Sequence, residues 1–226
     1  MPVLTITSRK GGCGKTTVAI ALAGALAAEG IDIALLDADA NTSAHRWATS
    51  NHEGRRIVAY AQADAEHLAD LLPALAERHA VLICDTAGFA NQAATVCIAA
   101  SDAVLVPVTP GEGDVIEAQR TVAFVDGLAR STRRAIPVRV LANRIRRQTT
   151  LSRHVLSEIE GLRLPRLSTV LSEAVGYGEM GFSGAIPRDG TAGEEIAALI
   201  AELRQIGWLP DNPEIHKSER TAIRHA

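Results

Sequence analysis

Short apolar runs alternate with longer stretches of helical periodicity along most of the chain. The runs are of the continuous kind that predicts strands buried on both faces of a parallel sheet, and they occupy residues 3–7, 31–36, 80–84, 103–108 and 136–142. Helices are predicted between them, at residues 18–28, 65–78, 91–99, 112–130 and 151–160. This alternation indicates an α/β fold, a doubly wound and mostly parallel sheet with helices on both faces.

The length and composition indicate one domain. With 226 residues and 47% hydrophobic content, the chain suffices for one sizeable α/β domain but not for two ordinary domains and a linker. We expect this domain at residues 1–210, followed at 211–226 by a polar tail that is either disordered or a docking site for a partner. No basic-then-apolar leader and no 18-residue charge-free apolar span is found, so the protein is expected to be soluble and cytoplasmic.

The three cysteines, Cys13, Cys84 and Cys97, have no Cys-x-x-Cys spacing. Such a sparse, odd set is typical of small buried thiols in a reducing compartment. We therefore expect neither a disulfide framework nor a cysteine-held metal.

The segment Arg-Lys-Gly-Gly-Cys-Gly-Lys-Thr-Thr, at residues 9–17, follows the first predicted strand directly. Its glycines let the backbone take positive φ and turn N–H groups toward a polyphosphate. Lys15 is placed to meet the β- and γ-phosphate oxygens and Thr16 to ligate Mg²⁺, and the next helix begins with its positive dipole end toward the anion. The order strand, glycine-rich loop, helix predicts a nucleoside-triphosphate site. Its predicted contacts are Gly11, Gly12, Cys13, Gly14, Lys15, Thr16 and Thr17.

Lysine is rare in this chain and concentrated in the loop. Of the 23 basic residues only Lys10, Lys15 and Lys217 are lysines, so arginine is the default cation elsewhere. A compact ammonium group at both loop positions is therefore required rather than incidental. Lys15 is enough to bind a nucleotide in cis, which leaves Lys10 free to reach a phosphate held by another subunit and predicts a dimer.

With this motif the chain resembles the ParA/MinD family of deviant Walker-type ATPases, whose signature is Lys-Gly-Gly-x-Gly-Lys-Thr. The resemblance implies a P-loop NTPase fold, ATP and Mg²⁺ as ligands, and a homodimer that sandwiches two nucleotides. Lys10 matches the family's signature lysine, which contacts the ATP of the partner subunit.

Two carboxylates follow the second predicted strand. Asp37 and Asp39 are two residues apart, so their side chains point the same way and can hold Mg²⁺ or orient an attacking water. The resemblance makes Asp37 the aspartate near the metal and Asp39 the switch I residue that positions the hydrolytic water. The family usually continues with Pro-Gln, whereas this chain has Ala40 and Asn41, a departure that bears on the rigidity of the turn and the rate of hydrolysis.

The third and fifth predicted strands add two further candidates. Asp85 matches a Walker B aspartate that fixes the waters of Mg²⁺, with a buried structural carboxylate as the alternative. Gly88 gives switch II the freedom to move with the γ-phosphate, although Ala87 replaces the family's usual proline. Asn143 offers an amide donor and acceptor to an adenine edge, but asparagine at a strand end is also an ordinary cap.

Phosphoryl transfer to water requires positioning and charge neutralisation more than a covalent participant. Lys10, Lys15 and Asp39 are the candidates for these catalytic roles. We expect an ATPase with slow intrinsic turnover that a partner, or the dimer itself, stimulates.

The net charge of −3 by itself argues against nucleic acid, but it conceals an asymmetry. Residues 128–168, here called the basic segment, contain ten arginines and only two acids, Glu158 and Glu160, which gives 10 − 2 = +8. Concentrated arginine predicts a phosphate-binding footprint for nonspecific DNA, and a solvated, salt-bridged face is the alternative. The footprint is assigned to Arg144, Arg146, Arg147 and Arg153.

The leading prediction is a ParA-like ATPase that dimerises with ATP, binds DNA nonspecifically on the nucleoid, and segregates or positions a plasmid, chromosome region or other cargo with a ParB-like or cargo-adaptor partner. Residues 211–220 have almost no apolar face, which disfavours a MinD-like membrane-associated ATPase. Because the loop begins at residue 9, no helix-turn-helix is expected ahead of it, as in small ParA proteins. The remaining alternatives are a same-fold biosynthetic ligase acting on a small molecule with ATP, a redox ATPase with a cluster on cysteines paired across a dimer, and a binder with an inactive site.

Overall fold

The computed structural model describes residues 2–88, 91–111, 113–146 and 149–211. Seven strands form one sheet in the order β3-β2-β4-β1-β5-β6-β7, and every neighbouring pair is parallel. The strands are β1 (Val3–Ile6), β2 (Ile33–Ala38), β3 (Val58–Ala61), β4 (Val81–Thr86), β5 (Ala103–Val108), β6 (Val138–Ile145) and β7 (Arg166–Ser172). The predicted doubly wound α/β fold is confirmed.

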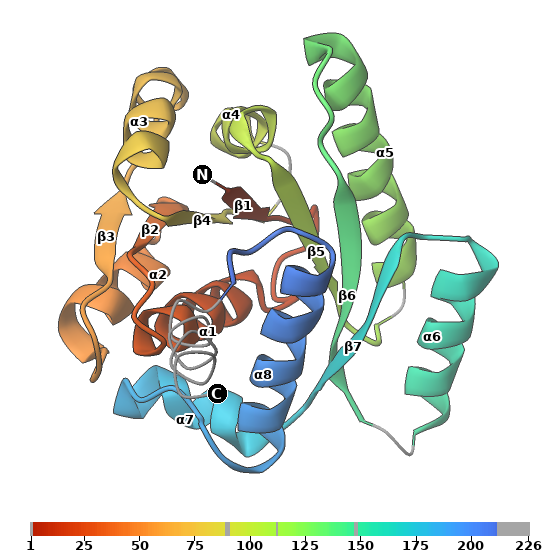
Figure 1. Cartoon of the computed structure of the whole chain (residues 1–226). Helices are drawn as coiled ribbons and strands as arrows, with labels where there is room; N and C mark the ends of the chain where they lie inside the picture. The colour runs from red at the N-terminus through yellow and green to blue at the C-terminus, as the bar shows by residue number, and fades with distance from the viewer. Residues whose placement is uncertain (1, 89–90, 112, 147–148, 212–226) are drawn as a thin grey trace, which may run out of the picture.

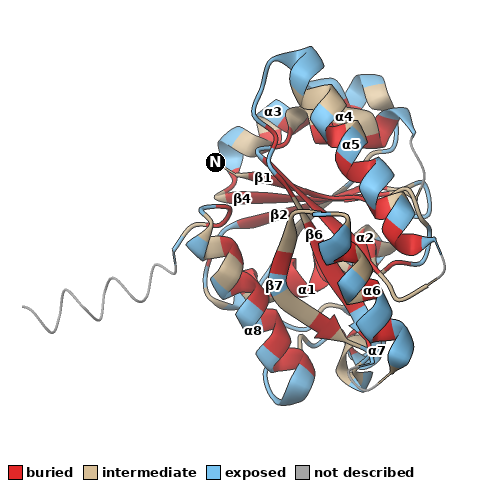
Figure 2. Ribbon diagram, turned by 90° about the vertical axis from the view of Figure 1, so that its right-hand side faces the viewer, coloured by how far each residue is buried: buried red, intermediate tan, exposed pale blue. Residues whose placement is uncertain are grey.

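Helices cover both faces of the sheet (Figures 1 and 2). They are α1 (Lys15–Ala28), α2 (Ser43–Arg46), a π-helical turn η1 (Trp47–Asn51), α3 (Ala65–Arg78), α4 (Gln92–Ala100), α5 (Asp114–Thr132), α6 (Thr150–Gly161), α7 (Val175–Ser183) and α8 (Gly190–Gln205). The largest apolar cluster packs α1 and α8 against one face, while two clusters pack α3, α4, α5 and α6 against the other. Because helices shield both faces, the central strands β1, β2, β4 and β5 are buried along their whole length, as their unbroken apolar runs predict.

The predicted strands and helices are all found, and β5 and α3 begin and end where the pattern predicts. The pattern did not predict β3, β7, α7 and α8. Both missed strands lie at the edges of the sheet, where their residues are mostly half-buried or exposed and polar side chains interrupt the apolar run.

The parallel arrangement brings the carboxyl ends of the strands to one edge of the sheet. Asp37 of β2 and Asp85 of β4 are register partners, and Asp85 also pairs with Ile6 at the end of β1. The loop after β1 therefore starts beside both aspartates. In doubly wound sheets this edge is where ligands bind.

The C-terminal part of the domain packs onto the α1 face. Trp208 and Leu209 are buried in the same cluster as α1 and α8. The tail from residue 212 onward lies outside the described residues. All three cysteines are buried free thiols.

Candidate functional site

Two of the three loop glycines adopt the backbone conformation that the sequence predicts. Gly12 has φ 77° and Gly14, which caps α1, has φ 89°. Gly11 does not have positive φ; it lies instead against Gly88, where an added Cβ would stand 3.1 Å from the Gly11 Cα. The expectation of a positive φ at Gly11 was therefore wrong. The absence of a side chain at this position lets the phosphate loop and switch II approach each other closely.

Lys15 points into the loop rather than into solvent. It is buried, and its ammonium donates a hydrogen bond of 3.3 Å to the Lys10 carbonyl oxygen. The Cys13 thiol also donates to this carbonyl, at 3.4 Å. A cavity of about 550 Å³ opens over the loop, and its walls include Lys15, Thr16 and Asp39. An anion in this cavity meets a buried ammonium group and the start of α1.

Lys10 is held by the first turn of α5. Its ammonium pairs with Asp114, whose side chain is only 4% exposed, and Thr109 donates to the other oxygen of that carboxylate. The same helix also fastens Arg9: its backbone N–H donates to Thr121 and its guanidinium pairs with Glu117. The positions 114, 117 and 121 share one helix face, which orients the start of the phosphate loop.

Thr16 and Asp85 form the center of a candidate magnesium site. The Thr16 hydroxyl donates to Asp85 Oδ2 at 2.7 Å, while Asp85 Oδ1 is buried and accepts no hydrogen bond from the described residues. Burial is the main cause that raises the pKa of Asp85 to about 7; the Thr16 hydrogen bond opposes this shift, and the nearby Asp37 carboxylate adds to it. A buried carboxylate with a free oxygen fits a cation or its water, which would restore the charged form.

The residues present fit Mg²⁺ better than a metal with an all-protein cage. No group of three or more His, Cys, Asp or Glu side chains within the described part of the chain could hold a metal ion. Mg²⁺ commonly takes few protein ligands and keeps waters and substrate phosphates instead. Thr16 and Asp85 would hold it beside the phosphates, where it would neutralise their charge.

Asp37 and Asp39, whose spacing predicts that their side chains point the same way, differ in burial and in hydrogen-bond partners. Asp37 is fully buried, and its oxygens accept the backbone N–H groups of Asp39 and His45 at 3.0 Å each. Asp39 lies beyond the end of β2, where the strand alternation no longer applies, and one of its oxygens accepts both the backbone and side-chain N–H groups of Asn41. Asp37 thus holds the switch I turn, and Asp39 and Asn41 line the phosphate cavity.

The side chain of Asn143 is hydrogen-bonded to the phosphate loop. Its amide donates to the Cys13 carbonyl at 2.8 Å and its oxygen accepts the Arg144 backbone N–H at 3.0 Å. A Cβ on Gly14 would stand 2.3 Å from the amide nitrogen, so the loop and the end of β6 are in close contact. A second cavity, of about 1050 Å³, lies beside this clamp, and its walls include Thr17, Asn143 and Tyr177. Its volume suits a nucleoside.

The arginines of the basic segment are divided between two edges of the sheet, and the described residues of the predicted footprint share one of these edges. The eight residues of β6 extend about 25 Å, so they separate the arginines before the strand from those after it. Arg144, Arg146 and Arg153 lie at the nucleotide edge; Arg147 lies outside the described residues. The arginines at the opposite edge are Arg130, Arg133, Arg134, Arg139, Arg163 and Arg166.

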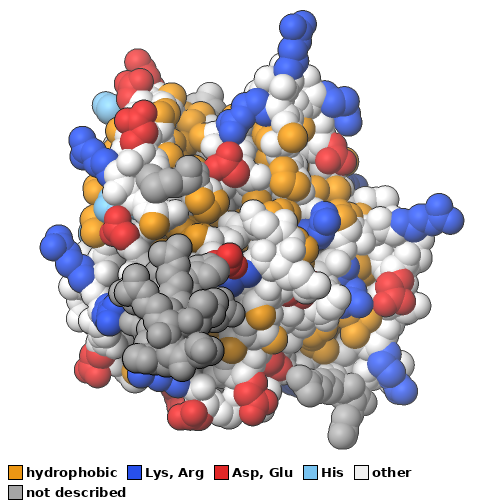
Figure 3. Space-filling view, in the orientation of Figure 1, with side chains coloured by type: hydrophobic (Ala, Val, Ile, Leu, Met, Phe, Trp, Pro, Cys, Tyr) orange, Lys and Arg blue, Asp and Glu red, His pale blue; other side chains and the backbone are white. Residues whose placement is uncertain are grey.

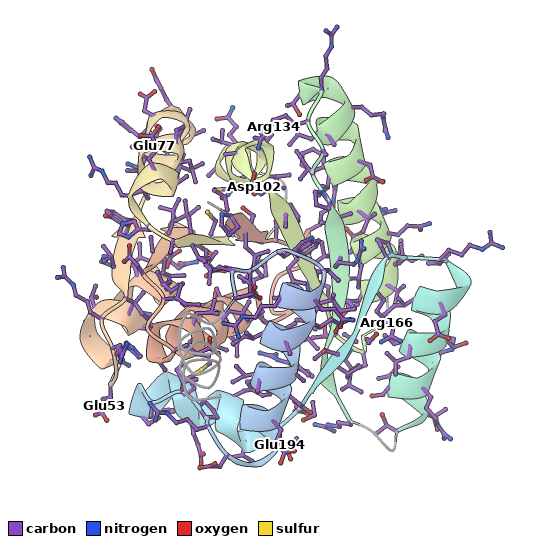
Figure 4. All side chains as sticks on the ribbon, in the orientation of Figure 1. Glu53, Glu77, Asp102, Arg134, Arg166 and Glu194 are labelled. Atoms are coloured by element: carbon purple, nitrogen blue, oxygen red, sulfur yellow. The ribbon has the colours of Figure 1, made fainter. Side chains whose placement is uncertain are left out.

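Several arginines of the segment are paired with acids, two of which come from other parts of the chain. Arg134 pairs with Asp102 at 3.5 Å, and Figure 4 shows both near the edge opposite α7. Arg146 pairs with Glu173, and Arg166 pairs with Glu160. On the face in Figure 3 the basic side chains are dispersed among acidic and apolar ones.

A family model described as VirC1 protein matches residues 1–187. The chain belongs to the VirC1 family. Its similarity to ParA/MinD-type proteins, which the loop motif indicates, is confirmed by the relatives below.

The VirC1-family chain is 34% identical over 172 residues to the protein virC1 of Rhizobium radiobacter, covering 72% of this chain and 73% of that one. With virC1 of Rhizobium rhizogenes it shares 33% identity over 150 residues, 64% of this chain and 65% of the relative. With the protein ParA of Rhizobium radiobacter it shares 33% identity over 110 residues, 49% of this chain. The chain spans 50% of that ParA and just under two thirds of the Rhizobium rhizogenes relative.

Solved structures show the same fold. A Cyanothece McdA(D38A)-ATP complex superposes with a TM-score of 0.77 at 17% identity, covering 93% of the VirC1-family chain and 98% of McdA. A cobyrinic acid a,c-diamide synthase from Mycobacterium smegmatis, with bound ADP and magnesium, gives a TM-score of 0.69 at 18% identity over 93% of this chain and 98% of that one. Among the described residues, no helix is both long and apolar enough to cross a membrane.

Sequence reasoning missed two residues of this VirC1-family site. Asp114 was not singled out, although it opens a predicted helix at the strand edge where ligands bind. Arg144 was assigned to DNA, but it lines both cavities beside the loop. Only Asp114 had a signal in the sequence, namely an acid directly after a predicted strand and turn; the orientation of Arg144 depends on a backbone turn that its sequence does not reveal.

Proposed function

We propose that this VirC1-family protein is a ParA-like ATPase that forms an ATP-sandwich dimer, holds DNA nonspecifically, and positions or segregates a DNA or other cargo with a ParB-like or cargo-adaptor partner. The observation that carries the proposal is the convergence of Lys10, Lys15, Thr16 and Asp85 on one glycine-rich loop. The membership in a family with partition and positioning relatives supports it.

The nucleotide is ATP with Mg²⁺ in this proposal. Lys15 binds the β- and γ-phosphates, Thr16 and Asp85 hold Mg²⁺ with Asp37 close behind, and Gly11, Gly12, Cys13, Gly14 and Thr17 supply the loop. Asp39 orients the attacking water, because its second oxygen remains available while Asn41 holds the first. Gly88 contacts Gly11 of the phosphate loop, and through this contact the conformation of switch II depends on whether a γ-phosphate is bound.

Dimerisation depends on Lys10. Its side chain is 42% exposed at the mouth of the loop, so the ammonium can leave Asp114 and reach a phosphate across a dimer interface. When Lys10 leaves Asp114 it loses the energy of that ion pair. Its interaction with a triphosphate offsets the loss, because the triphosphate carries more negative charge than one carboxylate. The site is therefore complete only when a second copy supplies its lysine, which makes intrinsic turnover slow.

DNA retention is assigned to Arg153, which is exposed at the nucleotide edge, and to Arg147, which lies outside the described residues; Arg146 is a weaker candidate because Glu173 neutralises it. A dimer presents each basic group twice. When both subunits contact the same DNA duplex, the affinity of the dimer exceeds that of a single subunit by more than a factor of two. The partner is a ParB-like protein, and the site of action is the nucleoid.

The test compares the full chain with ATP, with ADP and without nucleotide. We expect light scattering to show a dimer mass only with ATP, and a random-sequence duplex to be retained only in that state, with affinity that falls steeply as salt rises. Lys10→Ala should remain monomeric and release DNA, whereas Lys217→Ala, which removes the only lysine outside the loop, should behave as the wild type. Unchanged dimerisation and DNA retention in Lys10→Ala would contradict the proposal.

The fold does not distinguish this function from small-molecule ligation, because the superposed diamide synthase has it as well. Lys10 and its partner Asp114 favour a dimer-dependent switch. ATP turnover that depends on a metabolite and is independent of DNA and protein partners would favour the ligase.

A further inference from the structure

We propose that Arg144 contacts the nucleotide: its guanidinium holds the α-phosphate of an ATP bound in the same subunit. The inference rests on the proposed function, which supplies the ATP. It removes Arg144 from the DNA-binding group, where the sequence had placed it, and gives the phosphate loop a third cation from a distant strand.

The backbone of Arg144 is held in a conformation that turns it toward the loop. Its φ is 54°, in the left-handed region that residues other than glycine rarely adopt. The Arg144 N–H donates to the Asn143 side-chain oxygen, and the Asn143 amide donates to the Cys13 carbonyl. Strained backbone of this kind persists where the surroundings fix it, and it is common at ligand sites. The end of β6 is therefore fastened to the phosphate loop through one buried side chain.

The side chain reaches the point where the two cavities meet. Arg144 and Thr17 are the residues that line both the 550 Å³ cavity over the phosphate loop and the 1050 Å³ cavity beside it. The Arg144 Nε lies 3.9 Å from the place where a Cβ on Gly14 would stand. When the β- and γ-phosphates lie over the loop and the nucleoside fills the larger cavity, the α-phosphate lies at this junction.

The charge at the junction favours an anion. Glu173 lines the larger cavity and would neutralise Arg144, but its carboxylate pairs with Arg146 instead. The pKa of Glu173 is lowered first by the Arg146 hydrogen bond and to a smaller extent by the charge of Arg144. Among the described residues no carboxylate lies within ion-pair distance of Arg144. A planar guanidinium with free donors suits a phosphate oxygen.

The experiment measures equilibrium affinity for Mg·ATP, Mg·ADP and inorganic tripolyphosphate in the full chain. Arg144→Ala is compared with Arg144→Lys, which keeps the positive charge at the same strained backbone position. Arg130→Ala is the matched control, because Arg130 is exposed and belongs to the same basic segment but lies at the end of α5, at the opposite edge of the sheet. The melting temperature of each variant shows whether it is folded.

We expect Arg144→Ala to weaken ATP and ADP about equally, by roughly tenfold, and to weaken tripolyphosphate as well. Arg144→Lys should recover affinity to within about threefold of the wild type, and Arg130→Ala should not change it. Equal loss for ATP and ADP assigns the contact to the α- or β-phosphate rather than to the γ-phosphate.

Four results would overturn the inference. Wild-type affinity in Arg144→Ala shows that the side chain does not touch the nucleotide, and it leaves the proposed ATPase intact. Loss for ATP and ADP without loss for tripolyphosphate assigns the contact to the nucleoside. A loss in Arg144→Lys as large as in Arg144→Ala shows a structural role. Absence of nucleotide binding in the wild type overturns the proposed function and this inference together.

Discussion

The phosphate loop at residues 9–17 and the basic segment at residues 128–168 are both positive in sequence, but the fold treats them in opposite ways. The loop is a tight turn, so charges close in sequence stay close in space. The basic segment contains an eight-residue strand that carries its arginines to opposite edges of the sheet. Charge density along a chain therefore predicts charge density on a surface only where no extended element intervenes.

The two regions also differ in their partners. The side chains of Lys10 and Thr16 at the loop meet carboxylates brought from other elements, Asp114 at the start of α5 and Asp85 at the end of β4. In the basic segment, acids from elsewhere neutralise single arginines, as Asp102 does for Arg134. One region is assembled around a ligand, and the other is in part an ordinary salt-bridged surface.

The largest expected difference between the two regions is in nucleotide affinity. Lys15→Ala should lower the affinity for Mg·ATP by about a hundredfold or more, because it removes the buried ammonium inside the loop. Arg134→Ala, at the far edge of the sheet, should change it by less than about twofold. Isothermal titration calorimetry measures the affinity for Mg·ATP in both variants. Similar losses of affinity in the two variants would contradict the proposed difference between the loop and the basic segment.

A second difference is the dependence of stability on pH. Burial raises the pKa of Asp85 to about 7, so the folded chain keeps a proton that the unfolded chain loses near the ordinary aspartate pKa of 3.8. The stability that this protonated carboxyl contributes is fully present below 3.8 and is lost as pH rises through about 7. Relative to Asp85→Asn, the wild type without Mg²⁺ should lose about 2 to 3 kcal/mol between about pH 5 and about pH 8.

Urea unfolding of both proteins at several pH values measures this slope. Mg·ATP should reduce the wild-type loss, because a cation stabilises the ionised carboxylate. If the free energy of unfolding varies with pH in the same way for the wild type and Asp85→Asn without Mg²⁺, Asp85 is already charged in the folded wild type.

A smaller effect is expected from releasing Lys10. Asp114→Asn keeps the shape of the side chain but removes the charge that holds the ammonium in cis. The ATP concentration for half-maximal dimerisation should fall by about threefold to tenfold. Light scattering across an ATP titration tests this expectation. Glu117→Gln is the control on the same helix face, because it removes the charge that pairs with Arg9 and Arg120 rather than with Lys10. An unchanged or higher ATP requirement in Asp114→Asn would mean that Asp114 does not compete for Lys10.

The smallest effects belong to single arginines of the basic segment. Arg153→Ala should reduce the slope of log affinity for random DNA against log salt by about 1, and Arg146→Ala by less, because Glu173 already neutralises Arg146. Fluorescence anisotropy over a salt series at saturating ATP gives both slopes. A larger change for Arg146→Ala would show that DNA displaces Glu173.

The central part of the fold was predictable from the sequence because its strands are buried on both faces. Continuous apolar runs identify β1, β2, β4, β5 and β6, whereas the half-exposed edge strands β3 and β7 carry no such signal. The loop glycines, Lys15 and Thr16 were predictable because their spacing is a local requirement of a phosphate cradle. The hydrogen bonds that Asp39 accepts from Asn41 were not, because the chain leaves the strand at that point.

The sequence by itself determined the alternation of elements, the phosphate loop and the presence of a second lysine, since each depends on residues that are neighbours along the chain. Only the tertiary structure decided that Asp114 pairs with Lys10, that Asn143 donates a hydrogen bond to Cys13, and that Arg144 lines both cavities beside the loop. These contacts join residues far apart in sequence, and they depend on strand order, register and the direction of single side chains. Packing of the whole sheet sets these features, and no local pattern contains them.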